Sequence, residues 1–427
     1  MTVPHDPNRQ LSITDPALLR GLTQRRLGRR DFLRLAGLSG GAAALAACGV
    51  SGAKKNNGGS TTDAVSKYWA GKTQAGTLDF ASWPLYMDVS ENNKNDHPSL
   101  DLFTKQHGIK VNYKEVIQDD DSFFGTIQPS LAANQSIGYD LMVITNGLVL
   151  DKLINLGYLA PLDHSKLPTF AKNASPSVTN PSYDPNNAYT VAWQSGLTGI
   201  GYDPKRTGRE ITSYEDLFDP KFKGKVGMFG DNQDLPTLAL VGMGIKPETA
   251  TPDDWRKAAA KLKKQRDDGL VRKYYEQDYI DPLSKGDIWI SMAWSGDIFQ
   301  ANASGANLKF VAPKEGSVLW TDNMCIPYHA AHPVDAITYM DFVYQPTIAA
   351  MLAEAIDYIT PVPAANAAIL SDAAKLSGSD AADLKELATD PLIFPSSAEL
   401  AKAHRYQVLN AAQEKEWNSI FEPIYQA

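Results

Sequence analysis

Aromatic and carboxylate side chains recur together in this sequence where the predicted strands end. The faces of aromatic rings attract cations by about 0.5–2 kcal/mol each, and carboxylates make charge-assisted hydrogen bonds to amines. Together they indicate a site for an extended organic cation, although each residue taken alone is more simply explained as part of the core or the surface. The set consists of Trp83, Tyr86, Asp231, Asp234, Trp294, Trp320, Asp322 and Tyr358.

Signals for other kinds of chemistry are weaker. Beyond residues 1–47, the sequence has no Gly-x-Ser-x-Gly nucleophile motif, and it has no glycine-rich phosphate-binding loop after a strand. His329 and His332 lie in a proline-flanked loop without an acid at metal-ligand spacing, so neither a metal nor another cofactor is predicted. The acidic run at residues 119–121 is interpreted as the start of a helix, with no ligand role. A glycosidase that uses Asp231 and Asp322 as its two carboxylates is the enzymatic alternative.

The elements that would position these residues alternate between strand and helix. Apolar and β-rich runs predict the strands, and apolar residues at helical spacing predict the helices. This alternation is typical of α/β units with parallel strands, and the ligand of a pair of such units lies in the cleft between them. Predicted strands cover residues 78–81, 109–116, 140–144, 189–193, 197–202, 226–229, 288–294 and 308–312, and predicted helices cover residues 99–106, 121–133, 148–155, 236–243, 252–266 and 333–355.

The composition is that of a globular protein, and it limits the possible partners. Of the 427 residues, 43% are hydrophobic and 21% are charged, which excludes a disordered chain. The formal net charge is −8, whereas a nucleic-acid-binding surface needs clustered Lys and Arg, so no nucleic acid partner is expected. Two cysteines are too few for a disulfide framework, and Cys325 is expected to be a buried, inert thiol.

Residues 1–47 are typical of an export signal rather than of a folded segment. Arg29 and Arg30 precede a weakly apolar stretch, an order that matches twin-arginine signals. The stretch runs into Leu-Ala-Ala-Cys-Gly, which resembles a bacterial lipobox in which Cys48 receives the lipid. Residues 48–76 are poor in large apolar side chains and are predicted to form a flexible tether that contains a short amphipathic segment at residues 64–69. The protein is therefore expected to be lipid-anchored on the extracytoplasmic face of the cell membrane.

The remainder of the chain resembles the spermidine/putrescine-binding proteins of polyamine ABC importers. The matching segments are residues 78–86, 139–143, 218–224 and 313–322, and the most specific is Pro-Lys-Glu-Gly followed by Trp320 and Asp322. The resemblance implies an α/β type II periplasmic-binding-protein fold, with two lobes joined by crossing hinge strands and a ligand cleft between them. It implies a first lobe of residues 77–193 with 321–366, and a second lobe of residues 194–320 with 367–427.

The same resemblance implies a monomeric binding protein, not an enzyme, that captures a polyamine by cleft closure and delivers it to ABC permease subunits. Gln407 would be a polar contact to the ligand. The chain departs from the family at Pro84, where relatives have a hydroxyl residue, and at Gly147, where they have a stacking tyrosine. Another organic cation or amino compound is therefore the alternative ligand. The implied aromatic walls are Trp83, Tyr86, Trp294, Trp320 and Tyr358, and the implied amine-binding acids are Asp322 at one site and Asp231 with Asp234 at the other.

Overall fold

The computed structural model describes residues 61–90, 93, 95–276 and 278–426. The expected signal sequence, its paired arginines and Cys48 lie outside these residues. Ten strands form one mixed sheet, in the order β2-β1-β3-β9-β4-β7-β5-β6, with β10 paired to β9 and β8 paired to β4. The strands are β1 (Thr77–Ser82), β2 (Lys110–Glu115), β3 (Leu141–Thr145), β4 (Thr190–Tyr202), β5 (Val226–Phe229), β6 (Val271–Tyr275), β7 (Ile290–Trp294), β8 (Lys309–Val311), β9 (Ser317–Cys325) and β10 (Ala403–His404).

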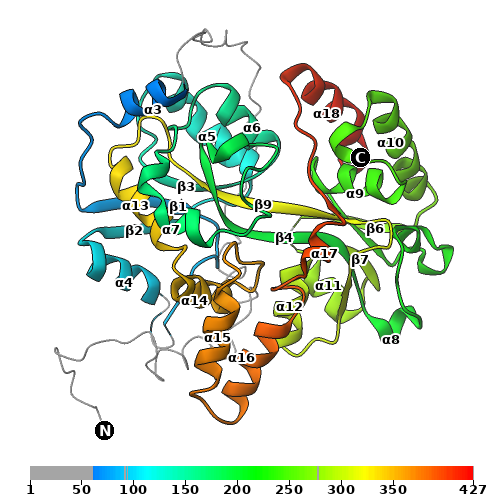
Figure 1. The fold of residues 1–427 in the computed structure, drawn as a ribbon. Helices are drawn as coiled ribbons and strands as arrows, with labels where there is room; N and C mark the ends of the chain where they lie inside the picture. The colour runs from blue at the N-terminus through cyan, green and yellow to red at the C-terminus, as the bar shows by residue number, and fades with distance from the viewer. Residues whose placement is uncertain (1–60, 91–92, 94, 277, 427) are drawn as a thin grey trace.

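Two long antiparallel strands, β4 and β9, connect the two halves of the molecule (Figure 1). The C-terminal part of β9 pairs with β3, where parallel strands β1, β2 and β3 form the sheet of the first lobe. The C-terminal part of β4 pairs with β7 and β8, and β7, β5 and β6 form the parallel sheet of the second lobe. The β4–β9 register shifts between Ala192 and Gln194, so a bulge interrupts the ladder between the lobes.

Helices cover both faces of each lobe sheet because the strands bury side chains on both faces. In the second lobe the C-terminal helix α18 packs on α10 (Figure 1). The helices are α3 (Thr61–Trp69), α4 (Pro98–His107), α5 (Asp120–Ala132), α6 (Leu148–Asn155), α7 (Pro168–Asn173), α8 (Pro204–Thr207), α9 (Asp234–Gly242), α10 (Pro252–Asp267), α11 (Ile280–Lys285), α12 (Ser295–Ala303), α13 (Pro333–Phe342), α14 (Pro346–Ile356), α15 (Ala365–Ala373), α16 (Ser379–Thr389), α17 (Ser397–Leu400) and α18 (Ala411–Tyr425). None of the helices in the described part of the chain is both long and apolar enough to cross a membrane.

The predicted elements agree with the structure except at a few places with identifiable causes. Strand β5 and helix α6 have the expected bounds. The two extended segments expected at residues 189–202 are one strand, β4. The single helix expected over residues 333–355 is two helices, because Pro346 lacks the N–H that a helix interior needs and instead begins α14.

The flexible tether was expected to reach residue 76, but the chain is already folded from Thr61. Helix α3 buries Tyr68 and Trp69 against the first lobe, and the Trp69 indole N–H donates to the carbonyl of Pro161 at 2.8 Å. The backbone N–H groups of Ala75 and Gly76 both donate to the Asp335 carboxylate. The predicted tether therefore extends too far, because α3 and the residues after it are bound to the first lobe. Two aromatic side chains suffice to dock this short helix.

The loop that carries His332 was expected to have no acid near it, and the structure corrects this. His332 donates its backbone N–H to Asp140 Oδ1 at 2.8 Å, and its Nδ1 lies 2.8 Å from Asp140 Oδ2. Asp79 is also within this cluster, and its backbone N–H donates to Asp140. Asp79 comes from β1, and Asp140 is the residue before β3, 192 positions before His332, so local spacing could not reveal either acid. The hydrogen bonds alone account for the arrangement, which fastens the loop to the sheet.

Candidate functional site

Asp322 lies on β9 between the lobes, and its carboxylate accepts two hydrogen bonds from the first lobe. Tyr86 donates its hydroxyl to Oδ2 at 2.5 Å, and Thr145 donates its hydroxyl to Oδ1 at 2.6 Å. The pairing of β3 with β9 places Thr145 opposite Asp322, which fixes this geometry. Burial raises the pKa of Asp322 to about 6, although both hydroxyls act in the opposite direction. The site is a buried carboxylate that would be stabilised by a cation.

Asp234 forms a second acidic centre, in the second lobe. It begins helix α9, and its carboxylate accepts hydrogen bonds from the Thr198 hydroxyl at 2.7 Å, the Trp294 indole at 2.7 Å and the Tyr406 hydroxyl at 2.8 Å. Three donors around one buried carboxylate hold its rotamer. Burial nevertheless raises the pKa of Asp234, with these three hydrogen bonds opposing the effect.

Asp231 lies beside Asp234 in the loop after β5. Its Oδ1 accepts the backbone N–H groups of Gln233 at 2.7 Å and Asp234 at 2.5 Å. Burial and then the charge of Asp234 raise the pKa of Asp231 to about 7. Half-buried Asp231 and buried Asp234 are neighbouring carboxylates that repel each other, so positive charge would be favourable here as well.

Aromatic rings connect the two acidic centres. The ring of Tyr358 is in edge contact with Trp320, at a centroid distance of 5.2 Å, and with Tyr86, at 6.2 Å. The Tyr358 hydroxyl donates to Asp297 at 2.9 Å, and the Tyr279 hydroxyl donates to the other oxygen of Asp297 at 3.1 Å. The backbone N–H of Trp294 in turn donates to the Tyr279 hydroxyl at 2.9 Å. A continuous path of rings and hydrogen bonds thus runs from Asp322 to Asp234.

Tyr406 lies between the two acidic centres. Its hydroxyl is bonded to Asp234, and its pKa is raised well above the usual range, first by burial and then by the charges of Asp234, Asp231 and Asp322. The Tyr406 ring also lies beside Gly147 of the first lobe, where an added Cβ would be 3.3 Å from it. The structure therefore brings together seven of the nine residues predicted from the sequence, and these are Tyr86, Asp231, Asp234, Trp294, Trp320, Asp322 and Tyr358.

The other two predicted residues are bonded elsewhere. The Trp83 indole donates to the carbonyl of Val143 at 3.0 Å, and its ring packs against the core of the first lobe. The Gln407 amide accepts from the Trp255 indole at 3.1 Å and donates to the carbonyl of Ala250 at 2.9 Å. Both ends of the Gln407 amide are thus used within the second lobe, so a contact to a ligand would have to replace one of these bonds.

Several members of the site were not singled out from the sequence. Asp120, taken as a helix-start residue, begins α5 and lies near Asp322 and Thr145. Its Oδ1 is buried, and no hydrogen-bond partner for it is found among the described residues. Burial, and then the charge of Asp322, raise the pKa of Asp120 well above its ordinary value. The signal that could have found it is its place after β2, where acids meet the carboxyl ends of parallel strands. The other missed residues are Thr145, Thr198, Tyr279, Asp297 and Tyr406.

A family model described as bacterial extracellular solute-binding protein matches residues 137–385. That span is more than half of the chain. The chain belongs to this family. As a solute-binding protein it is not an enzyme, and the glycosidase alternative for Asp231 and Asp322 is set aside. The family is extracellular, in agreement with the location outside the cytoplasm that was expected from residues 1–47.

Two individual relatives each match about four fifths of this solute-binding protein. The spermidine/putrescine-binding periplasmic protein of Salmonella typhimurium is 30% identical over 355 residues, which cover 82% of this chain and 90% of that protein. The putrescine/cadaverine-binding protein of Pseudomonas aeruginosa is 28% identical over 353 residues, which cover 78% of this chain and 92% of that protein.

Solved structures confirm the expected two-lobed, type II periplasmic-binding-protein fold. A putative spermidine/putrescine ABC transporter protein from Listeria monocytogenes matches with a TM-score of 0.67 and 24% identity, over 82% of this chain and 99% of that one. The Tp0655 lipoprotein of Treponema pallidum matches with a TM-score of 0.66 and 18% identity, over 82% of this chain and all of that one.

Proposed function

We propose that this solute-binding protein captures a polyamine of the putrescine or spermidine type. The observation that carries the proposal is the pair of buried acidic centres, Asp322 on one side and Asp234 with Asp231 on the other, connected by aromatic rings. A polyamine carries ammonium groups separated by methylenes, so its charges match separated carboxylates and its methylenes match ring faces. The names of the relatives, which bind spermidine, putrescine or cadaverine, support the same ligand class.

The mechanism that fits this arrangement is closure of the two lobes around the amine. Asp322 is held by hydroxyls of the first lobe, and Asp234 and Asp231 belong to the second. A diamine that contacts both centres gains its full interaction energy only when the lobes approach each other, so binding shifts the population toward the closed form. No bond is made or broken in the solute.

The proposal includes a location and a partner. Cys48 would carry a lipid that holds the protein at the outer face of the membrane, after export directed by Arg29 and Arg30. The monomeric protein would then deliver the amine to ABC permease subunits. The lobes would comprise residues 77–193 with 321–366 and residues 194–320 with 367–427, in keeping with the crossing of β4 and β9 between the two sheets.

A second candidate is another organic cation or amino compound in the same cleft. The reason is Gly147, which replaces a ring that relatives of this class present. A Cβ at Gly147 would lie 1.7 Å from Gln233 Oε1 and 3.3 Å from the Tyr406 ring, so these two side chains fill the space beside it. Without a ring at Gly147, one wall of the cleft lacks a stacking surface, which favours a solute other than an extended polyamine.

A panel of matched amines tests the proposal. Putrescine, cadaverine and spermidine are compared with 1-aminobutane, which has the same carbon chain as putrescine but only one ammonium group. Thermal unfolding followed by calorimetric titration should show a rise in melting temperature and tight binding for at least one polyamine, and much weaker binding for the monoamine. Equal responses to putrescine and 1-aminobutane, or none to any polyamine, would contradict the two-centre proposal.

A further inference from the structure

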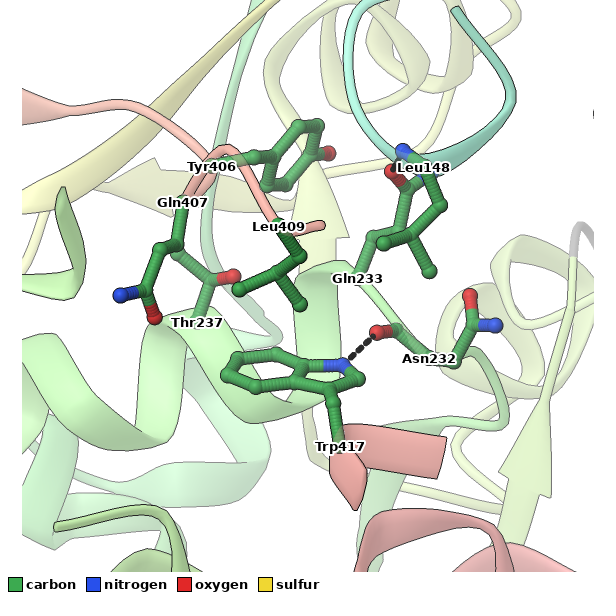
Figure 2. Close-up of a pocket in the computed structure, with 8 residues that line it drawn as sticks. All are labelled: Leu148, Asn232, Gln233, Thr237, Tyr406, Gln407, Leu409 and Trp417. Carbon is green, nitrogen blue, oxygen red and sulfur yellow. Dashed lines mark hydrogen bonds between the residues drawn. The ribbon is translucent and has the colours of Figure 1, made fainter. Parts of the chain in front are cut away.

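One hydrogen bond joins the two lobes through the start of helix α6. The backbone N–H of Leu148, the first residue of α6 in the first lobe, donates to the side-chain Oε1 of Gln233 in the second lobe at 2.9 Å. The first N–H groups of a helix have no partner within the helix. The N-cap residue Gly147 has no side chain to satisfy them. A side chain of the opposite lobe therefore caps this helix, and Figure 2 shows Leu148 and Gln233 next to each other.

Gly147 is required for this contact. A Cβ at this position would lie 1.7 Å from Gln233 Oε1 and 2.8 Å from Gln233 Cδ, distances at which the amide would have to move away. The backbone of Gly147 also has a φ of 127°, which side chains rarely permit. The residues usually preferred at an N-cap, Ser, Thr, Asp and Asn, would occupy the place that the Gln233 amide takes.

Gln233 is itself held firmly, between the acids of the second centre. Its backbone N–H donates to Asp231, and the carbonyl of the preceding Asn232 accepts the Trp417 indole N–H at 2.6 Å (Figure 2). One helical turn after Leu148, Lys152 forms an ion pair of 2.7 Å with Glu414 of helix α18. Two residues on the same face of α6 thus contact the second lobe, next to the loop that carries the candidate amine-binding residues Asp231 and Asp234.

We propose that Gln233 is a positioning residue that latches the lobes together by capping α6. The cap exists only when the lobes meet, so it adds to the stability of the closed form without contacting the solute. The inference rests on the cleft of the proposed function but not on the solute being an amine.

The test measures the distance between the lobes directly. Spin labels are attached to Lys114→Cys in β2 and Lys264→Cys in α10, which are both exposed positions. Pulsed electron resonance then reports the distance between the two labels. The protein also carries Cys48→Ser, and Cys325 is buried, so the labels attach at the two introduced cysteines. Gln233→Ala and Gly147→Ala should lengthen or broaden the distance distribution without added amine, and they should weaken amine binding roughly five- to tenfold. Gln233→Glu should retain the short distance, because a carboxylate oxygen also accepts at a helix N-terminus.

The matched controls are Gly157→Ala and Gln135→Ala. Gly157 has a positive φ at the other end of α6, but its Cβ would meet nothing within 4 Å, and Gln135 is exposed. Neither change should alter the distance between the labels. An unchanged distribution in Gln233→Ala would overturn the latch, and so would weaker binding without a change in distance, since Gln233 would then act on the solute itself. If the distance between the labels increases in Gln233→Ala and Gly147→Ala, but neither the wild type nor any variant binds an amine, the latch is supported and the amine proposal is overturned.

Discussion

Tyr86 and Asp322 share a hydrogen bond of 2.5 Å across the boundary between the first lobe and the crossing strand β9. Thr145 occupies the other carboxylate oxygen. Both donors are neutral, so they orient the carboxylate and leave its negative charge uncompensated. The arrangement suits a carboxylate that must be pre-positioned for an ammonium group and must keep the charge that attracts it.

Tyr86→Phe should weaken amine binding a few-fold at pH 7, with most of the loss recovered at pH 8. The hydroxyl lowers the pKa of Asp322 from the value that burial alone would set, so its removal moves that pKa upward and reduces the ionised fraction near neutrality. Calorimetric titration at the two pH values measures the effect. Tyr339→Phe removes a buried hydroxyl of the same lobe that donates to the sulfur of Met87, and it should bind like the wild type. A loss of affinity that is the same at both pH values would contradict the explanation.

Amine affinity should rise with pH between 5 and 7, and binding should release protons. Burial raises the pKa of Asp322 to about 6 and that of Asp231 to about 7. Between the ordinary value of 3.8 and these values the folded protein holds more protons than the unfolded chain, so its stability without ligand falls as pH rises through this window. A bound cation favours the ionised forms of these carboxylates, so the amine affinity rises as pH rises through the same window.

For Asp322 alone the affinity should be about tenfold lower at pH 5 than at pH 7. Titrations in two buffers with different ionisation heats would show the released protons. Affinity independent of pH, together with heats independent of the buffer, would show that these carboxylates do not meet the cation.

Asp120→Asn should leave amine affinity at pH 7 nearly unchanged and should maintain or raise the melting temperature. Asp120 is close to Asp322, and burial followed by the charge of Asp322 raises its pKa well above its ordinary value, so a second negative charge on Asp120 is disfavoured beside an ionised Asp322. Asparagine has the same shape and no charge to lose. Thermal unfolding and calorimetric titration of Asp120→Asn and Asp322→Asn, measured in parallel, compare the effects of two neighbouring carboxyl groups on stability and on amine affinity. An equal loss of affinity in both variants would mean that Asp120 also carries charge in the complex.

The fold was predictable where the sequence signal is local. Buried strands such as β5 are uninterrupted apolar runs, and α10 begins with Thr251 and Pro252, a strong helix-start signal that the structure confirms with a capping box. Strand β6 was missed because it reads Val-Arg-Lys-Tyr-Tyr at the edge of the sheet, where exposed positions take polar residues. A docking contact such as that of Trp69 depends on a partner more than 90 positions away.

The site was predictable by residue type but not by partner. Acids and rings at predicted strand ends indicated Asp322 and Asp234 as candidates, and the resemblance to a known family gave them their expected role. The hydrogen bonds that decide each role come from distant elements, such as those from Tyr279 and Tyr358 to Asp297. For the same reason the amide of Gln407 could not be recognised as engaged by Trp255.

Cys48→Ala should release the protein from the membrane or leave it unprocessed. The predicted lipobox at residues 45–49 is the expected membrane attachment, and alanine cannot accept a thioether-linked lipid. Fractionation of cells that produce the wild type or the variant checks this, with Cys325→Ala as the control because that thiol is buried. Mature, membrane-bound protein from the Cys48 variant would contradict the anchor.

The most direct test of the amine-binding account is calorimetric titration of the wild type and Asp322→Asn with putrescine and spermidine. Asparagine keeps the shape and hydrogen-bonding capacity of the side chain but removes its charge, so binding should weaken by about 2–4 kcal/mol, as when one member of a buried charge pair is lost. The melting temperature without ligand should stay the same or rise, because a buried carboxylate with a raised pKa is a cost to the protein alone. Tight and equal binding of the amines by both proteins would contradict the account.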